Sequence, residues 1–139
     1  MNRYVVDTDI LTLFQSGHAA VLDHVQACPA GQLAISIISV EEELRGWFTK
    51  LRRAKKCDQL ARVYQCLIDA VRFFSNLQVV SFTEPAIARY DNLRKAHRNI
   101  SKNDLRIAAI VLEHSDTLAT ANVKDYQAIA GLKIEDWSK

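Results

Sequence analysis

Residues 5–14, VVDTDILTLF, join an apolar run to a helical pattern through two carboxylates, and this stretch decides the fold. The run Arg3–Asp7 has the short, apolar, β-branched character of a buried strand. Helical spacing follows from Asp9 to Ser16 and ends at Gly17. A strand that leads directly into a helix, with acids at the junction, predicts the first unit of an α/β sheet.

The same alternation of short apolar runs and helical patterns continues along the chain. Further strands are predicted at Gln32–Ser39, Leu77–Phe82, Asp116–Asn122 and Leu132–Trp137. Helices are predicted at Ala19–Ala27, Val40–Lys56, Asp58–Phe74, Asn103–His114 and Asp125–Ala130, with one more capped by Thr83 and carrying Pro85 in its first turn. This order predicts an α/β/α sandwich on a mostly parallel sheet of about five strands.

Three helices differ in how their apolar residues are distributed. The helix Asn103–His114 is apolar nearly all round, so we expect it to be deeply buried. The helix from Asp58 has an apolar stripe that we assign to the core, made of Leu60, Val63, Tyr64, Leu67, Ile68, Val71 and Phe74. Trp47 and Phe48 of the preceding helix fit either the core or a dimer interface, and we favour the core.

Length and composition fit one compact domain, residues 1–139. The chain is 49% hydrophobic and 24% charged, with 4 Gly and 2 Pro, which excludes disordered and collagen-like chains. We find neither a secretory signal nor an apolar run long enough for a membrane span, so we expect a cytoplasmic protein. The 3 cysteines form no Cys-x-x-Cys pair, which predicts reduced thiols rather than disulfides or a zinc cluster.

Positive charge is modest overall but concentrated in two segments. The formal net charge of +2 permits nucleic-acid binding without requiring it. KLRRAKK (Lys50–Lys56) and RKAHRNISK (Arg94–Lys102) are the basic clusters. Each is either a solvated helix face or a contact surface for phosphates.

Polar side chains recur where predicted strands end and helices begin. Asp7 ends the first strand, Glu42 follows the second, Asp104 opens the buried helix, and Asn122 and Asp125 follow the fourth strand. Parallel sheets bind ligands at the carboxyl ends of their strands, so these residues can meet at one edge. The alternative is structural, because the Ser39–Glu42 and Ser101–Asp104 spacings also fit helix capping.

A convergent set of carboxylates would need a cation. Two such charges 4 Å apart repel by roughly 4 kcal/mol at an effective dielectric constant near 20, so the group must take up protons or bind an ion. Ligands that are all oxygen favour a hard ion, Mg²⁺ or Mn²⁺. An ion of this kind with open positions is suited to phosphodiester hydrolysis.

Four stretches together resemble a known family. VVDTDILTLF, ISIISVEEELRGW, ISKNDLRIAAIVLEH and LATANVKDYQAIAGLKIEDW are similar in order and spacing to the PIN-domain ribonucleases. Within these, the chain most resembles the VapC toxins of bacterial toxin–antitoxin pairs. The similarity runs from Tyr4 to Trp137, and the combination of the four motifs is far more specific than the opening motif alone.

The resemblance implies a site of three or four acids that binds Mg²⁺ or Mn²⁺. Carried over by position, the catalytic and metal-binding acids are Asp7, Glu42, Asp104 and, as the fourth, Asp125. Asn122 stands where many members carry Asp, and it would serve as an oxygen ligand or hold a water.

The resemblance also assigns supporting roles. Asp9 departs from the commoner Asn of the opening motif, and we expect it to cap the first helix and support the acids. Thr8 and Thr120 are candidates to donate hydrogen bonds to the acids. Candidate phosphate-guiding residues are Arg52, Lys55, Arg94 and Lys102.

The implied function is endonucleolytic hydrolysis of RNA, with a cognate antitoxin and a second copy of the chain as protein partners. Three alternatives remain open from the sequence. One is a PIN-like nucleic-acid-processing protein outside a toxin–antitoxin system. Another is a haloacid-dehalogenase-like phosphatase, suggested by the Asp-x-Asp of Asp7 and Asp9. The third is a non-catalytic binding module whose acids only cap helices.

Overall fold

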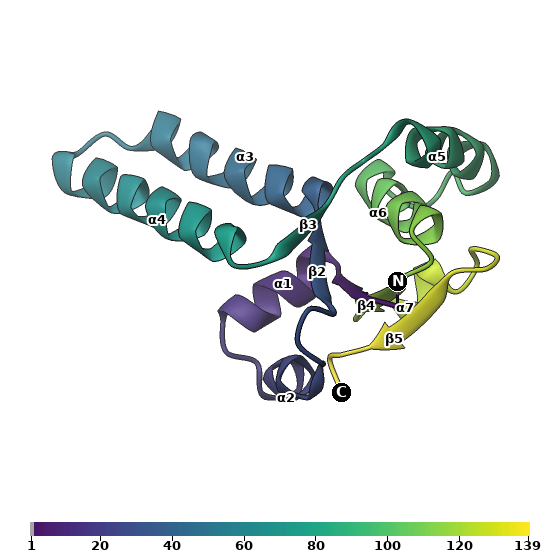
Figure 1. The fold of residues 1–139 in the computed structure, drawn as a ribbon. Coiled ribbons are helices and arrows are strands. Elements are labelled where there is room, and N and C mark those ends of the chain that lie inside the picture. The colour runs from purple at the N-terminus through teal and green to yellow at the C-terminus, as the bar shows by residue number, and fades with distance from the viewer. Residues whose placement is uncertain (1) are drawn as a thin grey trace.

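A parallel sheet lies at the centre of the computed structural model, which describes residues 2–139 (Figure 1). Within these residues the strands are β1 (Tyr4–Val6), β2 (Leu33–Ser36), β3 (Gln78–Val80), β4 (Thr117–Thr120) and β5 (Lys133–Asp136). Their order across the sheet is β3-β2-β1-β4-β5, and every neighbouring pair is parallel. The predicted five-stranded α/β fold is therefore confirmed, with β1 at the centre.

Helices connect the strands and cover both faces of the sheet. They are α1 (Thr8–Gln15), α2 (Ala19–Ala27), α3 (Ile37–Arg53), α4 (Cys57–Ser75), α5 (Glu84–Ala96), α6 (Lys102–Glu113) and α7 (Val123–Tyr126), counted over residues 2–139. The predicted bounds of α2 are those observed, and those of α1 and α6 differ by one residue at each end. The last short helix, α7, lies two residues earlier than predicted at its start.

Successive strand residues face opposite layers, as the twofold period of a strand requires. Val5 and Leu118 pack with the buried residues of α6, whereas Val6 and Ala119 pack with Ile10 of α1 and with α2. Helix α6 contributes six buried residues, which confirms the prediction that it lies deep in the core. Because α6 is held on one face and α1 on the other, their first turns are fixed relative to the sheet edge between them.

Two boundaries differ from the prediction because of a serine cap. The strand predicted to reach Ser39 ends at Ser36, whose side chain accepts a hydrogen bond from the Ser39 amide at 3.3 Å and begins α3. The capping pair predicted for Ser39 and Glu42 is therefore wrong, since both residues lie inside α3. The caps predicted at Thr83 for α5 and at Ser101 for α6 are confirmed.

Helices α3 and α4 form a hairpin that projects from the rest of the fold (Figure 1). The apolar stripe of α4 is buried only at its base, where Phe74 is 8% exposed. Further along, Tyr64 is 53% exposed and Val71 57% exposed, and Phe48 on α3 is 47% exposed. The assignment to the core is confirmed for Phe74, and Trp47 packs against the same core cluster. It is wrong for Tyr64, Val71 and Phe48, because no other segment among residues 2–139 covers the projecting part of the hairpin.

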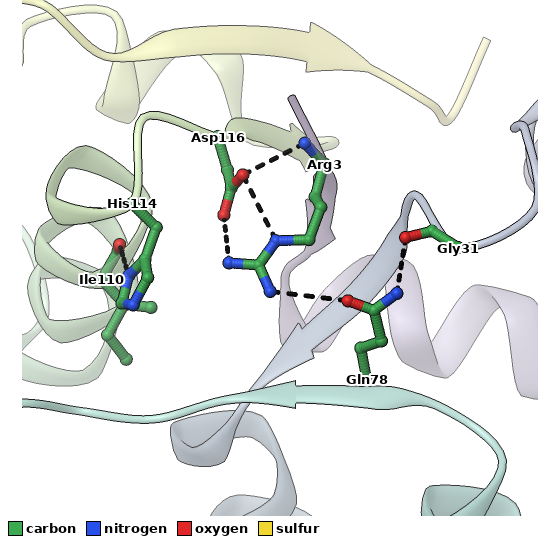
Figure 2. A network of polar contacts seen from close by, with 6 residues as sticks. All are labelled: Arg3, Gly31, Gln78, Ile110, His114 and Asp116. Atoms are coloured by element: carbon green, nitrogen blue, oxygen red, sulfur yellow. Dashed lines mark hydrogen bonds and ion pairs between the residues drawn. The ribbon is translucent and has the colours of Figure 1, made fainter. Parts of the chain in front are cut away.

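A polar network fastens the sheet at the amino ends of its strands (Figure 2). The Arg3 guanidinium donates to Asp116 at 2.9 Å, and the Arg3 backbone amide donates to the same carboxylate at 3.1 Å. Arg3 also donates to the side-chain oxygen of Gln78, whose amide nitrogen donates to the Gly31 carbonyl. The network joins the residue before β1 to the residue before β4, to the first residue of β3 and, through it, to the loop before β2, so the strands start in register.

Among residues 2–139, none of the helices combines the length and apolarity that crossing a membrane requires.

Candidate metal-binding site at the carboxyl edge of the sheet

Asp7 follows β1 directly and is 3% exposed. Its backbone is extended, and its Oδ1 accepts a hydrogen bond from the Ile10 amide at 2.9 Å, so Asp7 is the N-cap of α1. The prediction that Asp9 caps this helix is wrong, because helical geometry starts one residue earlier, at Thr8. The second oxygen, Oδ2, accepts a hydrogen bond from the Thr120 hydroxyl at 2.6 Å, which confirms the role expected of Thr120.

The environment of Asp7 disfavours its negative charge. The pKa of Asp7 is raised from 3.8 to about 6, mainly by burial. The charges of Asp9 and Asp104 act in the same direction, and the hydrogen bonds from Thr120 and Ile10 oppose the rise. A carboxylate with a raised pKa and acidic neighbours is unstable as an isolated anion. A cation placed beside it would reverse this balance.

Asp104 lies in the first turn of α6, where its backbone amide donates to the Ser101 cap at 3.1 Å. Its side chain is half-buried, and burial is the main cause that raises its pKa. The charges of Asp9 and Glu42 also raise that pKa, and the nearby hydroxyls of Ser101 and Tyr126 oppose the shift. The charges of Asp9 and Asp104 act on Asp7, and those of Asp9 and Glu42 act on Asp104, so the four acids are near enough to interact although they come from three different helices and their caps.

Glu42 is directed towards α1 by a hydroxyl pair. Thr8 donates to the Glu42 carboxylate at 2.6 Å, which confirms the role expected of Thr8, and lies 2.9 Å from the Ser39 hydroxyl. The adjacent glutamates turn elsewhere, since Glu41 pairs with Arg45 and Glu43 accepts from Gln15. Of the three consecutive acids, Glu42 is the one that joins the acidic group.

Two further residues belong to this environment. Asp9 is exposed, and its charge raises the pKa of both Asp7 and Asp104, so it contributes to the acidic field rather than to the helix cap. Tyr126 was not singled out from the sequence; its hydroxyl is buried beside Asp104 without an aligned hydrogen-bond partner among the described residues. In the sequence, only the apolar side of the segment that forms α7 indicates that Tyr126 is buried.

Asn122 and Asp125 lie at the rim of the group. The Asn122 side chain donates to Asp125 at 2.9 Å, and its backbone amide donates to the Thr120 hydroxyl at 2.9 Å. Two successive hydrogen bonds through the Thr120 hydroxyl therefore link Asn122 to Asp7. Asp125 is exposed, and its charge is not among the main causes that raise the pKa of Asp7 or Asp104.

The acidic group has the donor chemistry of a site for a hard cation. Within the described part of the chain, no Lys or Arg forms an ion pair with Asp7, Asp9, Glu42 or Asp104. Over the same residues, no three potential ligands are already close enough to hold one ion together. Carboxylates that repel one another are expected to stand apart when no cation is between them. Their oxygen atoms and their uncompensated charge fit Mg²⁺ or Mn²⁺.

The acids also lie where an open parallel sheet binds ligands. The chain proceeds from β1 to β2 and β3 on one side and then crosses to β4 on the other side of β1. The strand order therefore changes direction between β1 and β4, and the crevice at their carboxyl ends is the expected ligand position. Asp7 ends β1 and Thr120 ends β4 at this point.

Known proteins with similar sequences and folds belong to one family. The sequence signature of the PIN domain matches residues 4–132. A curated relative, "Ribonuclease VapC1" of Haemophilus influenzae strain R2866, is 29% identical over 140 residues, covering 98% of both chains. "Ribonuclease VapC2" of Haemophilus influenzae strain ATCC 51907 is 24% identical over 142 residues and covers 99% of both.

Solved structures show the same similarity. The structure of VapBC-1 from nontypeable Haemophilus influenzae has a TM-score of 0.74 and 27% identity, and the match covers 98% of both chains. VapBC2 from Rickettsia felis, crystallised with a DNA fragment from its promoter, has a TM-score of 0.72 and 25% identity over 96% of this chain and 98% of that one. A phosphatase of the haloacid-dehalogenase type has no support from these matches.

Proposed function

Because this chain belongs to the PIN-domain family, we propose that it is a metal-dependent endoribonuclease of the VapC type, the toxin of a toxin–antitoxin pair. The observation that carries the proposal is the group of carboxylates at the switch point of the sheet, which contains two buried or half-buried acids with raised pKa values and no basic partner among residues 2–139. Its nearly full-length relatives include proteins named as VapC ribonucleases.

Asp7 and Asp104 are the proposed principal ligands of Mg²⁺ or Mn²⁺. Both are held by their backbones at helix starts, so their carboxylates are positioned before an ion arrives. Glu42 is proposed to bind directly or through water, with Thr8 fixing its orientation. Asn122 and Asp125 would complete the site at its rim, where they already bond to one another.

When bound, the ion would lower the pKa of a water and neutralise charge on the phosphate. The residues around it have separate tasks. Thr120 holds Oδ2 of Asp7 and so leaves that oxygen fixed towards the crevice. Asp9 and Glu42 supply negative charge that draws the cation into the crevice. The buried hydroxyl of Tyr126 can donate to Asp104 and hold it in one orientation.

Metal binding should depend on pH because ligands must be deprotonated. The pKa of Asp7 is raised to about 6. Below this pH a proton competes with the ion, so activity should rise between about pH 5 and 7 as Asp7 ionises.

The test is cleavage of a single-stranded RNA by wild type, Asp7→Asn and Asp104→Asn, each with Mg²⁺ and with EDTA. We expect cleavage by wild type in Mg²⁺ and at least about a 100-fold loss in the other samples, since a ligand or the ion itself is missing. Asp58→Asn is the matched control, because Asp58 lies on α4 with its side chain 72% exposed. Cleavage that survives both EDTA and Asp7→Asn would reject the proposal and favour a binding module.

The antitoxin is proposed from the relatives, several of which were solved as toxin–antitoxin complexes. A cognate antitoxin would cover the acidic crevice, and a basic side chain among the acids would substitute for the metal. Co-expression with the product of the adjacent reading frame should yield a stable complex without ribonuclease activity. A complex that retains full cleavage would contradict this arrangement. The proposed homodimer is tested by the mass of the purified chain in solution.

A further inference from the structure

A hollow of about 620 Å³ lies between the end of α5 and the start of α6. Its lining includes five basic side chains, namely Arg94, Lys95, His97, Arg98 and Lys102, and one acid, Asp91. The hollow is therefore strongly cationic even though the whole chain carries a formal net charge of only +2. It occupies the second of the two basic clusters in the sequence.

The cations of this hollow are not used within the protein. Across residues 2–139, the ion pairs of Arg and Lys involve Arg3, Arg45, Arg62 and Arg89. None involves Arg94, Lys95, Arg98 or Lys102. Four positive charges share the hollow with one acid, Asp91, and form no ion pair with it, so they repel one another and an anion between them would relieve that repulsion.

The hollow is built on a rigid base. Its floor includes Ile100 and Leu105, which are 7% and 1% exposed and belong to the main core. The Arg94 guanidinium lies 5.8 Å from the centre of the buried Tyr90 ring, a distance at which a cation and an aromatic face attract. The connection between α5 and α6 is short and its Ile100 amide bonds back to the His97 carbonyl. The cations are thus presented from fixed backbone positions.

This hollow lies at the end of α6 that also carries Asp104. Lys102 and Leu105 line the hollow, and Asp104 stands between them in the same first turn of α6. Successive residues of an α-helix are turned by about 100°, so Asp104 faces a different side of α6 from Lys102 at the same end of the helix. The other basic cluster is on the hairpin of α3 and α4, which projects away from α5 and α6 (Figure 1).

We propose that this hollow binds phosphates of single-stranded RNA next to the scissile bond, an inference that rests on the proposed ribonuclease function. The acidic crevice repels a polyanion until its metal is bound, so the substrate needs a neighbouring cationic surface that holds its backbone. Contacts to phosphate fix the position of the strand and carry no base preference. RNA is favoured over an acidic protein segment because the hollow shares the first turn of α6 with Asp104, one of the acids proposed to cut RNA.

The first measurement is equilibrium binding of a labelled single-stranded RNA to Asp7→Asn, which does not cleave it, over a range of salt concentrations. Adding Arg94→Gln and Arg98→Gln should weaken binding about tenfold or more at low salt. It should also reduce the slope of log K against log salt by about 1.4, since each phosphate contact with a single strand contributes about 0.7. Arg62→Gln with Arg72→Gln on α4 is the matched control and should leave the slope unchanged.

The second measurement is cleavage by the protein with Asp7 intact. Loss of Arg94 and Arg98 should raise KM about tenfold and leave kcat unchanged, because a contact to a phosphate that does not react is equally strong in the ground and transition states. If a variant without Arg94 and Arg98 still cleaves RNA with unchanged KM and salt slope, the phosphate-binding role of the hollow is rejected and the ribonuclease function is retained. Absence of cleavage by wild type would overturn the function itself. Loss of antitoxin affinity with unchanged RNA binding would assign the hollow to an acidic protein partner and reject our proposal.

Discussion

Each edge of the central sheet contains a buried aspartate, and the two differ in whether a positive charge compensates the carboxylate. Asp116 at the amino edge and Asp7 at the carboxyl edge are both 3% exposed, and both bond across β1 and β4. Asp116 receives a guanidinium and a backbone amide from Arg3. Asp7 receives only a hydroxyl and an amide, and its acidic neighbours raise its pKa. A compensated acid stabilises the fold, whereas an uncompensated one is available to bind a cation.

The largest effect on stability is expected from breaking the compensated edge. Arg3→Met leaves the Asp116 carboxylate, whose side chain is 0% exposed, without its cation. Removing one partner of a buried pair costs about 3–5 kcal/mol of the free energy of unfolding. The midpoint of urea unfolding at pH 7 measures this loss.

The control is Arg45→Met, which removes an ion pair whose side chains are 64% and 50% exposed. Such a pair contributes about 1 kcal/mol or less. Equal unfolding midpoints for Arg3→Met and Arg45→Met would show that the two edges do not differ in the way described.

At the carboxyl edge, where Asp7 is uncompensated, we expect a substitution to increase the free energy of unfolding. In the metal-free protein, the pKa of Asp7 is about 6 in the folded state and 3.8 in the unfolded state. The unfolded state therefore loses its proton first, and the folded state loses stability as the pH rises from about 4 to 6. Asp7→Asn removes this penalty and retains a good N-cap. We expect the variant to be more stable than wild type by up to about 3 kcal/mol at pH 8 in EDTA, with little difference near pH 4.

Urea unfolding of both proteins at the two pH values in EDTA tests this prediction. Asp58→Asn should match wild type at each pH, since Asp58 is exposed. A destabilised Asp7→Asn at pH 8 would mean that the Asp7 charge is compensated in the native protein.

Addition of Mg²⁺ should also distinguish the two edges, with a slightly smaller change in the free energy of unfolding. Mg²⁺ at about 100 times its Kd should stabilise wild type by about 2.7 kcal/mol, because it binds the folded state alone. Arg3→Met should gain the same increment from its lower starting point, while Asp7→Asn should gain almost none. Thermal unfolding with Mg²⁺ and with EDTA measures both shifts. An equal gain in Asp7→Asn would place the ion elsewhere.

The smallest effect concerns the hydroxyl that supports Asp7. Thr120→Val removes the donor to Oδ2 and the acceptor of the Asn122 amide. We expect a loss of about 1–2 kcal/mol at neutral pH and a higher Asp7 pKa, because that hydrogen bond favours the charged form. The pH range over which the folded state loses stability should therefore extend to higher pH. Thr12→Val, on an exposed hydrogen bond of α1, is the control and should leave that dependence unchanged.

The sequence predicted the sheet well because the strands and α6 are buried, and burial produces apolar runs that sequence patterns report directly. It identified Asp7 for the same reason, since Asp7 directly follows a buried strand, whereas Thr120 was identified through the family resemblance. It did not locate the start of α3, because Ser36 and Ser39 are equally good caps by residue type. Which serine ends the strand is decided by the pairing of β2 with β1 and β3, a tertiary effect.

The hairpin shows a limit of a different kind. Helical periodicity reports that one side of α4 is apolar, but not whether the domain itself covers that side. Tyr64 and Val71 satisfy the pattern as fully as Phe74 does, yet they remain exposed. Nor could the sequence place Tyr126 beside Asp104, because the two residues belong to different helices and meet only in the folded chain.

The parallel pairing of β1 with β4 also sets the order of events when the protein is made. Asp7 and its partner Thr120 are separated by 113 residues. A nascent chain that has not yet released β4 has neither a closed central sheet nor a fixed Asp7. Long-range parallel pairing is slow, and segments synthesised early must wait for it. A growing chain therefore cannot assemble the proposed metal site until β4 has been synthesised and has paired with β1.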